Sequence, residues 1–238
     1  LYEDEHILLV DKRPGLVVHP DETERVNTLI THIQAYLYQK KEWSPYQEGA
    51  FAPALCNRID RNTGGIVIAA KNAETLRVMN QKIRDRELKK YYLCIVHGTL
   101  PRPAGRLEGY ILKDEAKKQV TVSSRPRPGA KTAVTLYETL AVRNGLSLVR
   151  CQLITGRTHQ IRAHLAYLGK PVLGDIKYGN RKMNERTGTK TQALCAVRIS
   201  FLDVPEENTL HYLSGKVIKL KDPQILQQFD ALDKNKEA

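Results

Sequence analysis

The sequence has no apolar run long enough to cross a bilayer and no segment at its start that resembles a secretion signal. No apolar stretch approaches the roughly twenty residues that a transmembrane helix requires. The chain also does not open with a positively charged segment followed by an apolar core. We therefore expect a soluble, cytoplasmic protein.

Cysteine is sparse and acidic residues are outnumbered. The four cysteines, Cys56, Cys94, Cys151 and Cys195, are widely spaced and include no C-x-x-C pair. This spacing indicates neither a disulfide framework nor a zinc site. Cys94 and Cys151 fall in apolar, strand-like patterns, which favours small buried thiols at both positions.

The shortage of acidic residues gives the chain a strong positive charge. It has 38 Lys and Arg against 26 Asp and Glu, a formal net charge of +12. Such an excess indicates a polyanionic partner, which could be RNA, DNA or an anionic membrane surface. The 238 residues fall in the single-domain range, with room for two lobes, and contain no internal repeat or long linker.

One stretch sets a carboxylate between two arginines and ahead of two glycines. It reads Asn57-Arg58-Ile59-Asp60-Arg61-Asn62-Thr63-Gly64-Gly65. The β-branched run that follows, residues 66–70, predicts a buried strand, which places Asp60 at a loop–strand junction. Nearby cations favour an ionised carboxylate, which can act as a nucleophile or pair with a buried cation. On its own, the motif fits a solvated turn with local ion pairs equally well.

A second stretch, residues 155–171, follows a strand-like segment at 146–153 and then becomes helical in period. The apolar side chains that share one face of this helix are Ile161, Leu165 and Leu168. Gly169 and Pro171 end it. Arg162 borders the apolar face, and a partly desolvated guanidinium needs an acidic partner.

Together these motifs resemble the RluA-type pseudouridine synthases. The matching residues are Asn57-Arg58-Ile59-Asp60-Arg61-x-Thr63-x-Gly65, Thr155-Gly156-Arg157-Thr158-His159-Gln160-Ile161-Arg162, Asp175-x-x-Tyr178-Gly179, and the segments 7–20 and 90–98. They occur in the family's order from about residue 7 to about residue 201. Each motif alone is weak, but the combination is highly specific.

The resemblance implies a fold and a reaction. The implied fold is mixed α/β (α+β), with a largely antiparallel central sheet and flanking helices and loops around a catalytic cleft. The implied reaction isomerises uridine in RNA to pseudouridine, without a metal or any other cofactor. The implied catalytic residues are Asp60, Tyr92 and Arg162, with Arg162 paired to Asp60 and Tyr92 stacked on the uracil. Arg58, Arg61, Arg157 and His159 are the expected RNA-binding residues.

The sequence departs from the family pattern at three positions. Asn57 stands where the family usually has His, Gly64 where it has Ser, and Cys195 where it has a late His. None of them removes a catalytic residue, but Gly64 loosens the loop backbone and could change which RNA is accepted. Ribosomal RNA is the favoured substrate, and transfer RNA is the alternative.

Two other functions remain open at this stage. A catalytically inactive RNA-binding protein would use the same basic loops. A hydrolase acting on a glycosidic bond would ordinarily need two carboxylates, and the motifs supply one. The chain begins at Leu1 rather than Met, so we expect a fragment of a monomeric protein, with residues 1–238 as the catalytic domain. An S4-type RNA-binding domain could precede it.

The remaining pattern predicts the other elements. Predicted strands are 6–10, 16–18, 66–70, 90–97, 101–105, 106–112, 119–123, 133–142, 146–152 and 194–201. Predicted helices are 28–39, 73–86 with Asn72 as its N-cap, and 223–232 with Asp222 as its cap. We expect surface loops at 40–53 and 174–190, and a frayed end at 233–238.

Overall fold

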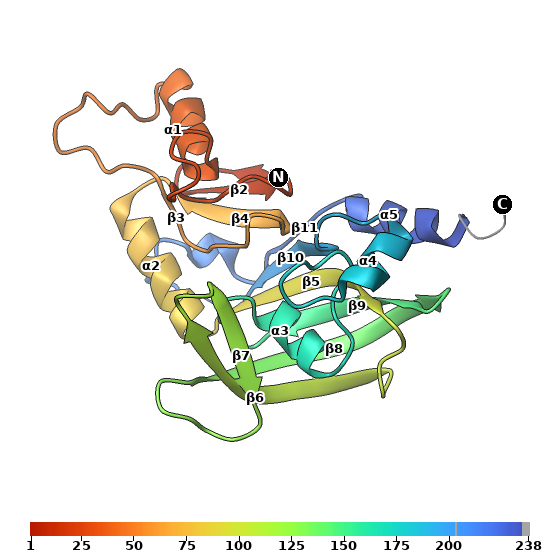
Figure 1. Ribbon diagram of the computed structural model, residues 1–238. Helices are drawn as coiled ribbons and strands as arrows, with labels where there is room; N and C mark the ends of the chain where they lie inside the picture. Colours follow the sequence, from red (N-terminus) through yellow and green to blue (C-terminus); the bar gives the residue numbers. More distant parts are fainter. Residues whose placement is uncertain (203, 235–238) are drawn as a thin grey trace. The chain divides into compact units, whose positions relative to one another are not determined.

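The computed structural model describes residues 1–202 and 204–234 and divides the chain into two compact units (Figure 1). Unit 1 contains residues 1–88 and 198–220, and unit 2 contains residues 89–197 and the residues from 221 onward. Each unit has its own antiparallel strands and its own helices. The mixed α/β class predicted from the sequence is confirmed. No helix in the described part of the chain is long and apolar enough to cross a membrane.

Unit 1 is built around β2 (Ile7–Lys12) and β4 (Gly64–Ala70), which pair antiparallel from Ile7 opposite Ala70 to Lys12 opposite Gly65. The two-residue strands β1 (Tyr2–Glu3) and β3 (Ala54–Leu55) pair with β2 and β4, respectively. All seven residues of β4 are buried, which confirms the buried strand predicted at 66–70 and extends it to both glycines. β11 (Val217–Lys219) pairs with the end of β10 (Leu194–Phe201).

The helices of unit 1 are α1 (Leu29–Gln39), α2 (Ala73–Arg84) and the short 3-10 helix η1 (His211–Leu213). The predicted N-cap is confirmed, because the Asn72 side chain accepts a hydrogen bond from Thr75 N at 2.8 Å. The α2 helix ends at Arg84, two residues earlier than predicted, and Arg86 has a φ of 63°. A left-handed residue cannot continue an α-helix.

The predicted strand at 16–18 is wrong. Val17 makes only an isolated bridge to Thr28, and the carbonyl oxygens of Val17 and Val18 accept hydrogen bonds from Leu29 N and Ile30 N. The first turn of a helix has N–H groups with no partner inside the helix. The segment therefore caps the start of α1 and does not form a hairpin with β2.

Unit 2 is built on five antiparallel strands in the order β5-β9-β8-β6-β7. They are β5 (Leu88–His97), β6 (Ala104–Asp114), β7 (Gln119–Ser123), β8 (Lys131–Arg143) and β9 (Leu146–Leu153). β8 and β9 form a hairpin through Asn144 and Gly145, both with positive φ. Two left-handed residues in an Asn-Gly pair give a turn whose twist matches that of the strands.

The predicted break between strands at residues 105 and 106 is wrong, because β6 is continuous from Ala104 to Asp114. Gly105 lies inside this strand, and a Cβ at that position would lie 2.8 Å from the ring of Tyr137 on β8. A glycine inside a strand can permit a close approach by a neighbouring side chain. The glycine allows Tyr137 to pack on the strand and does not mark a turn.

The helices of unit 2 are α3 (Gln160–Tyr167), α4 (Arg181–Thr187) and α5 (Gln224–Lys234). Ala163 of α3 packs in a buried cluster with Ile111, Val120 and Ala133 of β6, β7 and β8, which fixes α3 against the sheet (Figure 1). The loop predicted at 174–190 is wrong in part, because α4 lies within it. The frayed end predicted at 233–238 is wrong at residues 233 and 234, which belong to α5, and residues 235–238 lie outside the described residues.

Candidate active site

Asp60 lies in the loop between β3 and β4, four residues before β4 begins, as the sequence predicts. Its carbonyl oxygen accepts a hydrogen bond from Thr63 N at 3.0 Å, which closes a tight turn. Ile59 anchors the loop in the interior, and the Asn57 side chain accepts a hydrogen bond from Ile68 N at 2.8 Å. The half-buried Asp60 side chain is therefore carried by a loop that is fixed at both ends.

The buried side chain of Lys12 holds the backbone of this loop, a role that was not predicted from the sequence. Its side chain is 1% exposed, and its Nζ donates to the carbonyl oxygens of Arg13, Leu16 and Arg61 at 3.1, 2.7 and 2.8 Å. A buried ammonium is tolerated only when its donors are satisfied. One cation thus ties the 13–16 turn to the residue that follows Asp60.

The two arginines beside Asp60 lie at the surface. The Arg61 guanidinium donates to Thr23 Oγ1 at 2.6 Å and lies 3.8 Å from Asp21. Arg58 is exposed. The partial burial of His19 and the positive charge of Arg58 lower the pKa of His19. Both predicted RNA-binding arginines of unit 1 therefore lie beside the 19–23 loop.

In unit 2, Tyr92 lies on β5 opposite Cys151 of β9 and is 7% exposed. Lys90, two residues earlier, approaches the next motif, because a Cβ built at Gly156 would lie 3.5 Å from Lys90 Nζ. Burial lowers the pKa of Lys90. The expected buried thiols are also confirmed, since Cys94 and Cys151 are both fully buried.

Gln160 organises the loop that precedes α3. Its Oε1 accepts hydrogen bonds from Thr155 Oγ1 at 2.7 Å and from Arg157 N at 3.0 Å. Its Nε2 donates to Val134 O and to Thr135 Oγ1, each at 2.9 Å. This buried amide uses both its donor and its acceptor atoms, which fixes the loop against β8.

Arg162 is almost fully buried and binds a carboxylate through two nitrogens. Its Nε and a terminal nitrogen donate to Asp175 at 2.7 and 2.9 Å, and the two side chains are 4% and 1% exposed. Burial alone would raise the pKa of Asp175. The Arg162 guanidinium and the N–H groups of Tyr178 and Lys177 outweigh burial and hold that pKa below its usual value. The expectation that Arg162 needs an acidic partner is confirmed, and Asp175 is one such partner.

Tyr178 joins the remaining parts of this group. Its hydroxyl accepts a hydrogen bond from Val120 N at 2.8 Å and lies 2.8 Å from His159 Nδ1, while its ring lies 5.1 Å from the Arg162 guanidinium. His159 has a φ of 51°, in the left-handed region where His is one of the tolerated residues. The short motif ends in Gly179 because a Cβ there would lie 2.1 Å from Asp175 O.

The structure therefore assembles two groups, each within one unit. Asp60, Arg58 and Arg61 lie together with Lys12 in unit 1. Tyr92 lies in unit 2, as does the cluster of Arg162 and His159 with Asp175 and Tyr178. Arg157 extends from the same loop, where its Nε donates to Thr132 O at 3.0 Å. The predicted pairing of Arg162 with Asp60 joins the two units and stays a prediction.

The roles of Asp175 and Tyr178 were not predicted, although their motif was recognised. The signal available in the sequence was the need of Arg162 for an acidic partner. Asp175 is an acidic motif residue that follows α3 closely in the sequence. Lys12 gave a weaker signal, as a cation at the end of an apolar strand.

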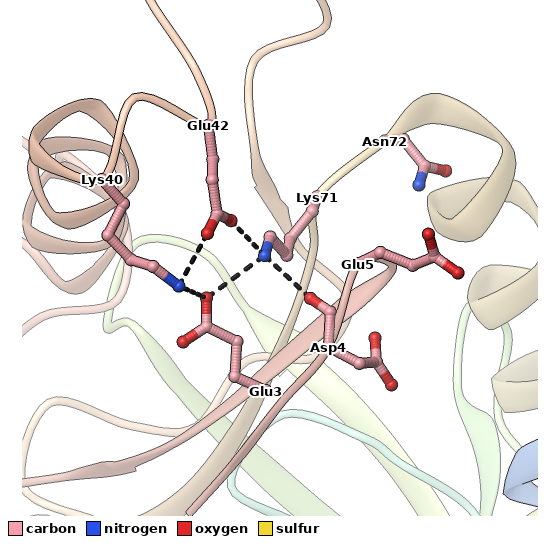
Figure 2. Close-up of a pocket in the computed structure, with 7 residues that line it drawn as sticks. All are labelled: Glu3, Asp4, Glu5, Lys40, Glu42, Lys71 and Asn72. Carbon is pink, nitrogen blue, oxygen red and sulfur yellow. Dashed lines mark hydrogen bonds and ion pairs between the residues drawn. The ribbon is translucent and has the colours of Figure 1, made fainter.

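A polar pocket in unit 1 contains none of these residues. Its volume is about 560 Å³, and its lining residues are Glu3, Asp4, Glu5, Lys40, Glu42, Lys71 and Asn72. Figure 2 shows that Lys40 and Lys71 lie between Glu3 and Glu42 and pair with both. Although burial opposes it, these contacts with Lys40 and Lys71 and that with Tyr36 lower the pKa of Glu3 to about 2. The network ties β1 to α1 and to the end of β4, which is a structural role.

Residues 1–202 and 204–234 contain no cluster of three or more His, Cys, Asp or Glu side chains that could hold a metal ion.

Comparison with known proteins places these motifs in one family. The family model described as RNA pseudouridylate synthase matches residues 6–167. An RNA pseudouridine synthase of Bacillus subtilis, YlyB, is 34% identical over 84% of this chain and 63% of its own length. Ribosomal large subunit pseudouridine synthase D of Borreliella burgdorferi is 34% identical over 75% of this chain and 54% of its own length.

A solved structure shows the same fold. Human RNA pseudouridylate synthase domain containing 4 matches with a TM-score of 0.74 and 23% identity, over 98% of this chain and 92% of that one. The chain spans less than two thirds of the length of both bacterial relatives.

Proposed function

Because this chain belongs to the RNA pseudouridylate synthase family, and within it to the RluA type, we propose that it isomerises uridine in RNA to pseudouridine. The C1′–N1 glycosidic bond breaks, the uracil turns, and a bond forms between C5 and C1′. The C5 proton is lost to solvent, and N1 takes up one proton from solvent in its place. Atoms and electrons balance within the nucleotide, so the step needs no oxidant or other reactant. The observation that carries the proposal is the matched motif set, with Asp60 on a loop fixed by Lys12.

The catalytic roles follow from charge and position. Asp60, kept ionised, attacks C1′ or C6 or assists departure of the base through the sugar. Arg162 keeps the Asp60 carboxylate charged and oriented after water is excluded. Tyr92 stacks on the uracil and assists removal of the C5 proton. The buried pair of Arg162 and Asp175 supports this assignment, because it gives Arg162 a single fixed orientation.

A uridine inside folded RNA must leave its stack before Asp60 can reach it. Arg58 and Arg61 flank Asp60, are exposed, and would bind phosphates at the entrance to the site. Arg157 and His159, in unit 2, would also contact the RNA. The family departure at Asn57 lies in the loop that carries Asp60, and the departure at Gly64 lies at the first residue of β4, directly after that loop.

We propose ribosomal RNA as the substrate, since the Borreliella burgdorferi relative is named as a pseudouridine synthase of the large ribosomal subunit. Transfer RNA is the alternative. We further propose that the protein acts in the cytoplasm as a monomer.

The test is to map pseudouridine in RNA from cells that lack the gene. Total RNA is incubated with the protein, treated with a carbodiimide that labels pseudouridine, and read by reverse transcription. The proposal predicts new stops at one or a few uridines of ribosomal RNA. Stops in transfer RNA alone would move the substrate to the alternative. RNA that is bound but gives no new stop would indicate the inactive RNA-binding protein and contradict the proposal.

A further inference from the structure

The segment from residue 174 to residue 190 has more positive charge than its own acidic residues can neutralise. It contains five Lys or Arg residues and two acidic residues. Both acidic side chains are already engaged, because Asp175 binds Arg162 and Glu185 lies 2.8 Å from Arg181. The cations left over within the segment are Lys177, Lys182, Arg186 and Lys190.

Lys182 and Arg186 share one face of α4, which we call the α4 basic face. Side chains four residues apart lie about 5–6 Å from each other on a helix. Both are exposed, and in the described part of the chain neither makes an ion pair. Like charges at this spacing destabilise a helix, so the arrangement gives α4 no stability of its own.

The opposite face of α4 is fixed inside the protein by one residue, Asn184. Its Oδ1 accepts a hydrogen bond from Gly174 N at 2.9 Å and lies 3.1 Å from His97 Nε2, and its Nδ2 donates to Asp175 O at 3.1 Å. Asn184 is 8% exposed on a helix whose other residues lie at the surface. A buried amide with three partners holds the helix in one orientation.

This anchor connects α4 to the proposed active site. The Asp175 backbone oxygen accepts a hydrogen bond from Asn184 Nδ2, and the Asp175 carboxylate accepts one from Arg162 Nε. The α4 basic face is therefore fixed to the same residue that orients the arginine of the site. A charged group that only kept the protein soluble would need no such anchor.

We propose that the α4 basic face binds backbone phosphates of the RNA next to the target uridine. The inference rests on the proposed RNA substrate and adds a second contact surface to it. Lys182 and Arg186, which make no ion pair in the described part of the chain, suit the continuous negative charge of one RNA strand. Asn184 is a positioning residue in this account, because it acts through the orientation of α4.

The test is salt-dependent binding of a radiolabelled RNA hairpin with seven uridines in its loop. Filter binding from 50 to 300 mM KCl compares the wild type with the double variant Lys182→Gln, Arg186→Gln. Losing two phosphate contacts should reduce the slope of log affinity against log salt by about 1.4 to 1.8. Near 100 mM salt the affinity should fall roughly 10- to 40-fold.

Two matched variants control for charge and for folding. Lys219→Gln with Lys221→Gln removes the same charge outside the segment and should change the slope by less than half as much. Lys182→Arg with Arg186→Lys keeps both charges and should retain the wild-type slope. Equal slope changes in the two neutralised variants would overturn the proposal, as would wild-type slope in Lys182→Gln, Arg186→Gln.

Binding is measured without turnover, so failure of this inference can be distinguished from failure of the proposed activity. Wild-type protein that forms pseudouridine while the α4 variant binds normally would contradict the inference alone. A wild type that binds through the α4 basic face but forms no pseudouridine would contradict the activity alone. A wild type with no salt-dependent binding would contradict both.

Discussion

The Arg162 guanidinium is the most constrained charged group in unit 2, and its energetics can be tested separately from catalysis. Arg162 and Asp175 are both almost fully buried and joined by two hydrogen bonds. Removing one partner of such a pair leaves an uncompensated charge in the interior, whereas replacing both partners with apolar groups is often tolerated.

We predict that Asp175→Asn destabilises the protein by about 3–5 kcal/mol. The double variant Arg162→Met, Asp175→Leu should recover much of that loss but stay inactive, because it lacks the proposed catalytic arginine. Urea unfolding of Arg162→Met, Asp175→Leu and the double variant measures the coupling free energy. Additive costs in the double-mutant cycle would show that the pair is not energetically coupled.

Lys12 acts on the Asp60 loop through the backbone, which makes a second prediction at this scale. Lys12→Met keeps the apolar stem but leaves the carbonyl oxygens of Arg13, Leu16 and Arg61 without their donor. Each buried group left unsatisfied costs about 1–3 kcal/mol. The turnover number should also fall, because the turn that carries Asp60 is no longer fixed.

The turnover number and the free energy of unfolding of Lys12→Met, measured side by side, check this prediction. Lys82→Met is a suitable control, because Lys82 is also buried in unit 1 but pairs with Glu87. The control should lose stability and keep a turnover number near that of the wild type. Equal loss of turnover in both variants would show that Lys12 contributes only general stability.

Among the structural elements, β8 and α3 are joined by a buried polar network that makes stability depend on pH. Gln160 Nε2 donates to Thr135 Oγ1, and the Thr135 hydroxyl in turn lies 3.0 Å from His164 Nδ1. One hydrogen bond therefore joins the Thr135 hydroxyl to His164 Nδ1. Within the described residues, His164 Nε2 has no hydrogen-bond partner.

Burial lowers the pKa of His164 to about 4. The unfolded chain, with an ordinary His, binds more protons between about pH 6.5 and pH 4, so stability falls as the pH falls through this window. The loss attributable to His164 should reach roughly 3 kcal/mol. Urea unfolding at several pH values should show a flatter profile for His164→Leu than for the wild type. Parallel profiles would contradict the assignment.

The same elements show what the sequence could predict and what it could not. The elements β4, α2, β5 and β9 were predicted because apolar periodicity and a cap residue mark them. The α4 helix was missed because only Asn184 on it is buried, so no apolar stripe marks it. Its caps, Asn180 and Gly188, were the only signal. The boundary predicted between residues 105 and 106 is absent from β6, where Gly105 makes room for the ring of Tyr137 inside a continuous strand.

The fold class is confirmed, whereas the catalytic roles of the candidate site residues stay predictions. Charge and neighbouring apolar residues drew attention to Asp60 and Arg162, and the family resemblance supplied the catalytic roles of both and of Tyr92. Asp175 and Lys12 could not be assigned roles in this way. Their partners are backbone atoms and side chains that only the folded chain brings to them.

For the whole molecule, net charge and the division into two units both bear on how the chain binds and modifies RNA. The formal charge of +12 favours binding of a polyanion such as RNA by the chain as a whole, and specific residues decide where the chemistry occurs. Asp60 belongs to unit 1, whereas Tyr92 and Arg162 belong to unit 2. The proposed isomerisation requires that all three residues act on one flipped uridine. The central claim is that Asp60 performs the isomerisation.

The most direct measurement is tritium release from RNA labelled at C5 of uridine, with the wild type and Asp60→Asn. The substitution keeps the size of the side chain and removes its charge. The account predicts release by the wild type, with the base still attached to the RNA, and a loss of roughly 1000-fold or more in the variant. Release by Asp60→Asn at the wild-type rate, or release accompanied by free uracil, would contradict it.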